Sequence, residues 1–136
     1  MKLGIVIADF NREITSRMEK KALEIAKNLK VKVDKKINVP GTFEIPIMVK
    51  KLLKNKNIDG VVALGAVIRG ETSHDIIVAE NASRKIMDLS LEYNKPVGLG
   101  IIGPRASWKQ AEKRAEEYAE RAVKTTAYMA TLLRNL

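Results

Sequence analysis

Three short apolar runs constrain the fold of this chain more than any other feature. They cover residues 3–8 (LGIVIA), 60–68 (GVVALGAVI) and 96–102 (PVGLGII). Continuous apolar runs of this length are typical of strands that are covered on both faces. We therefore expect three buried strands. The second run is the most apolar and should lie at the centre of a sheet, and Gly103-Pro104 should end the third.

Segments with other periodicities alternate with these runs. Residues 31–39 alternate between apolar and other side chains, as in an edge strand with one face in water. Other segments carry apolar residues at three- and four-residue spacing, which predicts helices with one buried face. These helices are expected over residues 13–29, over 45–53 after the turn at Pro40-Gly41, from a cap at Thr72 or Ser73, and over about 107–133.

The predicted order is β-α-β-α-β-α-β-α. Strict alternation implies parallel strands joined by right-handed helical crossovers, with helices on both faces of the sheet. A length of 136 residues fits one domain with one core, covering residues 1–136. The expected fold class is therefore α/β, a flavodoxin-like three-layer α/β/α sandwich with a four-stranded parallel sheet.

The composition excludes several classes of site and location. The chain has no cysteine, which excludes disulfide frameworks, thiolate zinc sites and cysteine nucleophiles. It has one histidine, so we expect no metal. No apolar run approaches the roughly 18 residues that a membrane span needs. The N-terminal residues are typical of a first strand and not of a signal peptide, so we expect a cytoplasmic protein without a membrane partner.

The chain is basic, with a formal net charge of +9 that is concentrated in one half. Residues 1–56 hold 14 basic and 6 acidic residues. Such a half can attract nucleic acid. Clustered charge on helix-like segments is, however, normally an exposed face, and the few aromatic residues are too scattered to stack bases. We expect no nucleic-acid partner, and any such binding should be abolished by moderate salt.

Polar residues follow each predicted strand, where ligands bind in sheets of this kind. The richest of these segments, residues 66–74, ends at a predicted helix start. Backbone N–H groups there, with Thr72 and Ser73 beside them, form a natural phosphate site, although either hydroxyl can instead simply cap the helix. His74 suits proton transfer near neutral pH, or it is merely an exposed histidine.

Two further groups of residues have a functional and a structural interpretation. Phe10 and Phe43 either belong to the core or stack on a flat ring. Glu44 either binds hydroxyl groups or only favours a helix dipole. Lys113 and Arg114 lie in the last predicted helix, where each either supplies a cation for phosphate or pairs with nearby glutamates.

Three segments at these loops resemble the lumazine synthase family. They are residues 10–12 (FNR), 40–46 (PGTFEIP) and 63–74 (ALGAVIRGETSH), and the resemblance covers essentially the whole chain. The compact C-terminal half is similar to archaeal members. The resemblance implies a transferase of riboflavin biosynthesis. It would condense 5-amino-6-(D-ribitylamino)uracil with (2S)-2-hydroxy-3-oxobutyl phosphate to 6,7-dimethyl-8-ribityllumazine, phosphate and water, without a cofactor.

The resemblance also implies roles for individual residues. Phe10 would stack on the pyrimidine, and His74 would donate and accept protons. The residues that follow the second strand would hold the ribityl chain; these are Thr42, Phe43 and Glu44. The end of the third strand would offer backbone groups to the pyrimidine, from Ala66, Val67 and Ile68.

The phosphorylated ketone would lie at the helix start, against Glu71 and Thr72. Leu99 stands where the family often has Phe, so it would serve as an apolar wall. The residue that grips phosphate depends on the length of the preceding loop. One inserted residue selects Arg114, which we favour because arginine binds phosphate bidentately, and no insertion selects Lys113.

The resemblance further implies a homo-oligomer, with active sites between neighbouring subunits of a pentamer. Some members build icosahedral shells from such pentamers. Two other functions are compatible with the same fold. One is an archaeal-type riboflavin synthase, which dismutates lumazine, and the Gly70–His74 segment argues against it. The other is a non-catalytic pigment-binding protein, which turnover of both substrates would exclude.

Overall fold

Four strands form a single parallel sheet in the computed structural model, which describes residues 1–136. They are β1 (Lys2–Ala8), β2 (Lys32–Val39), β3 (Gly60–Ile68) and β4 (Val97–Ala106), in the order β2-β1-β3-β4. β3 pairs with β1 on one side and β4 on the other. The most apolar run is therefore a central strand, and residues 31–39 form an edge strand, as predicted.

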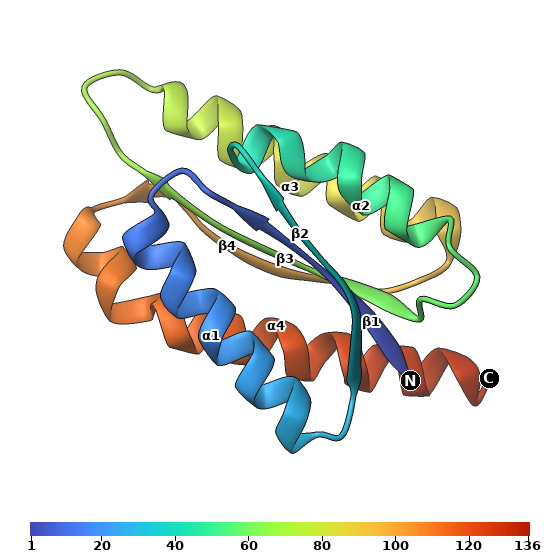
Figure 1. The fold of residues 1–136 in the computed structure, drawn as a ribbon. Helices are drawn as coiled ribbons and strands as arrows, with labels where there is room; N and C mark the ends of the chain where they lie inside the picture. Colours follow the sequence, from blue (N-terminus) through green and yellow to red (C-terminus); the bar gives the residue numbers. More distant parts are fainter.

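Helices cover both faces of this sheet (Figure 1). On one face lie α1 (Arg12–Asn28) and α4 (Trp108–Arg134), and on the other α2 (Ile45–Leu53) and α3 (His74–Tyr93). A short 3-10 turn, η1 (Thr42–Glu44), leads directly into α2. The α/β class and the predicted three-layer arrangement are confirmed.

Each face of the sheet has its own hydrophobic core. A cluster of 18 buried residues joins α1 and α4 to the sheet, and one of 14 joins α2 and α3 to the opposite face. The α4 side of the larger cluster consists mainly of alanines, which let the helix approach closely. These are Ala111, Ala115, Ala119 and Ala122.

The fourth strand differs from its prediction in position and in burial. β4 lies at the edge of the sheet, and Leu99 in its middle is 48% exposed. The apolar run predicted a strand buried on both faces, but a strand's place in the sheet depends on pairing with segments far away in the chain. Within one chain, nothing pairs with the outer edge of β4.

β4 also continues past the expected stop at Gly103-Pro104. The pairing with β3 steps from Ala66–Ile102 to Ile68–Ala106, so the strand bulges over residues 103–105 and then resumes. Proline lacks an N–H and is tolerated in a strand at such a bulge or at an edge. Gly-Pro therefore marks a bulge in this edge strand, where we expected its end.

None of the helices is long and apolar enough to cross a membrane.

Candidate active site

A cleft of about 320 Å³ lies at the carboxyl edge of the sheet. The loops after β1 and β2, the end of β3 and the first turns of α3 contribute to its walls. This is where ligands bind in sheets of this topology. The lining residues are Phe10, Asn11, Gly41, Thr42, Phe43, Glu44, Ala66, Val67, Ile68, His74 and Val78.

The two phenylalanines of this cleft are not core residues. Phe10 is 72% exposed and Phe43 is 59% exposed, although each ring borders the cleft. An exposed aromatic ring beside a cavity is available to stack on a flat ligand. Their exposure rules out the interpretation that both rings are simply buried in the core.

Backbone and side-chain contacts fix the loop that carries Phe10. The N–H of Phe10 donates to the carbonyl oxygen of Pro40 at 2.9 Å, which joins the loops after β1 and β2. Asn11 has a left-handed backbone (φ 63°), and its side-chain amide donates to the carbonyl oxygen of Ala66 at 2.8 Å. The loop after β1 is thereby held against the end of β3.

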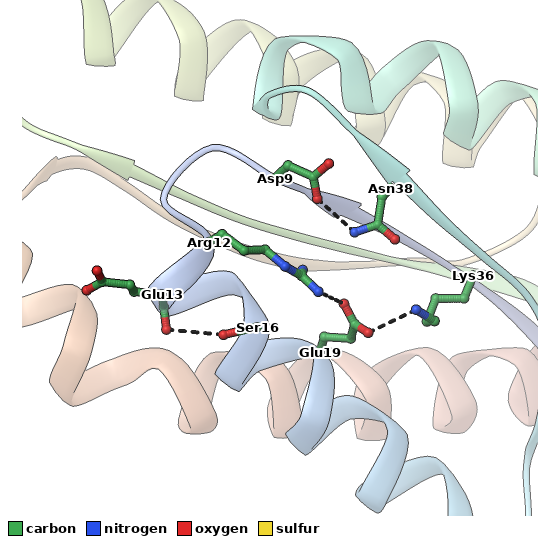
Figure 2. A network of polar contacts seen from close by, with 7 residues as sticks. All are labelled: Asp9, Arg12, Glu13, Ser16, Glu19, Lys36 and Asn38. Atoms are coloured by element: carbon green, nitrogen blue, oxygen red, sulfur yellow. Dashed lines mark hydrogen bonds and ion pairs between the residues drawn. The ribbon is translucent and has the colours of Figure 1, made fainter.

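A polar network supports this loop from the side of β2 (Figure 2). The amide of Asn38 donates to Asp9 at 2.8 Å, one residue before Phe10. Below it, Glu19 of α1 accepts from Arg12 at 2.7 Å and from Lys36 at 2.9 Å. Burial raises the pKa of the Glu19 carboxyl, but the hydrogen bonds from Lys36 and Arg12 outweigh it and leave the pKa below its ordinary value. The network ties α1 to the edge strand β2.

The turn η1 approaches β3 closely because position 65 is a glycine. A Cβ on Gly65 would lie 2.5 Å from Oγ1 of Thr42, closer than packed atoms allow. Thr42 is 5% exposed, so its side chain is packed over the strand, while Phe43 beside it is exposed. This contact places Phe43 and Glu44 at the cleft.

The start of α3 is lightly capped. Ser73 occupies the N-cap position, but its side chain makes no capping hydrogen bond. Thr72 accepts through Oγ1 from the N–H of His74 at 3.3 Å, a long hydrogen bond. The exposed loop before His74 carries Glu71 and Thr72, which do not line the cleft. The Ser73 hydroxyl therefore does not satisfy the first N–H groups of α3.

Comparison with known proteins identifies the family. A family described as 6,7-dimethyl-8-ribityllumazine synthase matches residues 1–134. This chain belongs to that family. A 6,7-dimethyl-8-ribityllumazine synthase from Metallosphaera sedula is 53% identical over 136 residues, which are 100% of this chain and 90% of the relative. One from Saccharolobus solfataricus is 54% identical over 136 residues (100% and 88%), and one from Staphylothermus marinus 52% over 128 residues (94% and 85%).

Membership of the lumazine synthase family confirms the resemblance drawn from the sequence. It makes the chain an enzyme of the transferase type in riboflavin biosynthesis. The family match says nothing about individual side chains, so the roles of the cleft residues stay predictions.

Two further residues expected in the lumazine synthase site lie apart from the cleft. Leu99 is on the edge strand β4, and Arg114 is on α4, the layer on the other side of the sheet from α3. Arg114 forms an ion pair with Glu117 at 2.9 Å, the local pairing that was its structural alternative. Lys113 is not among the cleft residues either. One chain therefore does not bring the predicted phosphate cation to His74.

Three residues line the cleft without having been given an individual role from the sequence: Asn11, Gly41 and Val78. Val78 follows His74 by one helical turn, and residues four apart share a face of a helix. That spacing was a usable signal. Asn11 and Gly41 lie in segments that carried the family resemblance, but nothing local in the sequence indicates that Asn11 reaches Ala66.

Proposed function

We propose that this cleft binds 5-amino-6-(D-ribitylamino)uracil and condenses it with (2S)-2-hydroxy-3-oxobutyl phosphate. The products are 6,7-dimethyl-8-ribityllumazine, phosphate and water. The observation that carries the proposal is the convergence in one cleft of two exposed aromatic rings, strand-end backbone groups and the only histidine of the chain. These are the groups needed to hold a flat ring and to move protons.

The aromatic and backbone groups hold the first substrate in this proposal. Phe10 stacks on the pyrimidine, for which its exposed ring is placed. The end of β3 offers peptide groups to the pyrimidine edge, and the turn η1 takes the ribityl hydroxyls. The residues concerned are Ala66, Val67 and Ile68 in β3, and Thr42, Phe43 and Glu44 in η1.

The reaction itself needs no protein nucleophile. The substrate amine attacks the ketone carbon and one water leaves as an imine forms. Phosphate is then eliminated, and the ribitylamino nitrogen closes the ring on the carbonyl that results, with loss of a second water. Holding two reactants in one cleft supplies a large part of the acceleration. His74, exposed at the cleft, passes protons between the reacting atoms and contributes about 10²-fold. Glu71 and Thr72 hold the phosphorylated ketone at the start of α3, where backbone N–H groups donate to its phosphate.

The remaining residues come from a neighbouring copy of the chain. Leu99 and Arg114 are exposed and lie outside the cleft of their own chain. An apolar groove of about 600 Å³ between α2 and α3 begins at Phe43 and includes Ile47 and Ile77, which are 67% and 54% exposed. Exposed apolar patches commonly mark interfaces. A homo-oligomer, here a pentamer that can assemble further into an icosahedral shell, would cover this surface and complete the site in the cytoplasm.

Mixing inactive subunits tests the shared site. His74→Ala and Arg114→Ala each damage a different part of it. At a concentration of the phosphorylated ketone well below its KM, neither variant alone should therefore turn over at the normal rate. When the two are unfolded and reassembled together in equal amounts, about one quarter of the interfaces pair an intact His74 with an intact Arg114. We expect about that fraction of normal activity. Activity equal to the average of the two variants would contradict a site between subunits.

A further inference from the structure

The start of α3 contains one buried charged residue. Asp75 is 6% exposed and follows His74 directly. It is the only buried residue between Val67 and Ala79. Its Oδ2 accepts a hydrogen bond from the backbone N–H of Arg105 at 2.9 Å. The carboxylate of Asp75 therefore connects the first turn of α3 to β4.

The other end of this contact is the bulge over residues 103–105. Arg105 has a left-handed backbone (φ 64°), which non-glycine residues adopt only where their surroundings hold them. Gly103 (φ 113°) lies against β3, and a Cβ there would come within 2.5 Å of the carbonyl oxygen of Val67. The bulge is thus held between the end of β3 and Asp75.

Few other hydrogen bonds fix the first turn of α3. The loop from Arg69 to His74 is exposed, Ser73 makes no side-chain cap, and the hydrogen bond from His74 to Thr72 is long at 3.3 Å. A buried donor or acceptor that loses its hydrogen-bond partner carries a desolvation penalty, so the bond between the buried Asp75 side chain and the N–H of Arg105 is costly to break. The hydrogen bond from Arg105 to Asp75 is therefore the one side-chain hydrogen bond that ties the turn carrying His74 to another element of the fold.

We propose that Asp75 is a positioning residue for the reaction: it ties the first turn of α3 to the bulge of β4 and thereby holds His74 at the cleft. The inference rests on the proposed role of His74. Asp75 itself touches no substrate, because its side chain is buried and its carboxylate is bound to a backbone N–H. A proton-transfer group displaced by about 1 Å can lose up to 10²-fold in rate, so an anchor at this place matters for turnover.

Two substitutions separate the position of the acceptor from its charge. Asp75→Asn keeps an oxygen at the same place and removes the charge, whereas Asp75→Glu keeps the charge and moves it by one methylene. We expect Asp75→Asn to keep kcat within about threefold of the parent, and Asp75→Glu to lower it about tenfold. The KM of the pyrimidine should change little in both. The opposite ranking would show that the charge matters and would overturn the proposal.

Asp75→Ala removes the acceptor altogether, and Asp88→Ala is its matched control. Asp88 lies on the same helix, is exposed and pairs only with Lys85 at 3.6 Å. We expect Asp75→Ala to lower kcat at least as much as Asp75→Glu and to speed amide hydrogen exchange over residues 103–106. Asp88→Ala should resemble the parent in both measurements. If Asp75→Ala does not fold, the comparison of the Asn and Glu variants still decides.

A double-mutant cycle shows whether Asp75 acts through His74. With His74→Ala already present, Asp75→Ala should lower kcat by less than about twofold, since there is no imidazole left to position. An equal loss in both backgrounds would overturn the proposal and assign Asp75 to stability alone. If His74→Ala by itself leaves the rate unchanged, the proposed function of His74 fails, and this outcome is distinct from the failure of Asp75.

Discussion

The side-chain amide of Asn11 donates a hydrogen bond to the carbonyl oxygen of Ala66 at 2.8 Å. The two residues are 55 positions apart in the chain, and both line the cleft. The bond joins the loop that presents Phe10 to the end of β3. It uses one of the two lone pairs of the Ala66 carbonyl oxygen and fixes the strand end that offers backbone groups to the pyrimidine in the proposed complex.

Two substitutions of Asn11 separate this hydrogen bond from the backbone conformation. Asn11→Gly keeps the left-handed backbone and loses the bond, which should cost about 1 kcal/mol of folding free energy. Asn11→Ala loses the bond and also disfavours the left-handed backbone, which should cost a further ~1–2 kcal/mol of folding free energy. Thermal unfolding at one fixed protein concentration measures both. Equal midpoints for the two variants would contradict the role of the backbone conformation. The KM of the pyrimidine should rise in both variants because Phe10 is displaced.

The close contact between β3 and η1 predicts an unequal pair of glycine substitutions. Gly65→Ala places a Cβ 2.5 Å from Oγ1 of Thr42, so η1 must move and we expect about 1–3 kcal/mol of destabilisation. Gly70→Ala has no atom within 4 Å of the added Cβ. Its folding free energy should stay within about 0.5 kcal/mol of the parent. Chemical denaturation compares them, and similar losses in the two variants would refute the packing argument.

The lowered pKa of Glu19 makes the stability of the chain depend on pH. The unfolded chain binds a proton at Glu19 more readily than the folded chain, so the stabilisation is present above an unfolded pKa of about 4.3 and is lost as the pH falls through the lower folded pKa. Glu19→Gln removes the carboxylate and with it this contribution to the pH dependence of stability. Thermal midpoints measured from neutral pH down to acid should therefore fall less steeply for the variant. Parallel curves would show that Arg12 and Lys36 do not stabilise the carboxylate.

The choice between Arg114 and Lys113 can be settled by paired kinetics. Arg114→Ala should raise the KM of the phosphorylated ketone at least about tenfold, because it removes the bidentate phosphate contact that we propose for the neighbouring subunit's arginine. Lys113→Ala should change that KM by less than about twofold. The KM of the pyrimidine serves as the internal control in each variant. The reverse ranking would assign the phosphate to Lys113.

Local pattern was sufficient for most of the fold. The apolar runs at 3–8 and 60–68 and the helical spacing between them concern residues close together in the chain, and they predicted the order and the central strand. β4 was misplaced because its edge position and its bulge at Gly103 depend on partners in β3. A Gly-Pro pair is compatible with a strand end and with a bulge, and only the pairing decides between them.

The candidate site shows the same division. The segments around Phe10, Thr42 and His74 could be assigned to one edge of the sheet because the carboxyl ends of parallel strands meet there. The contacts from Asn11 to Ala66 and from Asp75 to Arg105 join residues that no local pattern relates. In the proposed oligomer the position of Arg114 relative to His74 depends on a second subunit, and sequence spacing carries no information about that distance.

The most direct test of the account compares the parent enzyme with His74→Ala. Both proteins are mixed with the two substrates, and the lumazine chromophore and released phosphate are followed against a reaction without protein. We expect one phosphate per lumazine for the parent, and about a 10²-fold lower kcat for His74→Ala with the assembly intact by sedimentation. An undiminished rate in an intact His74→Ala assembly would contradict the account.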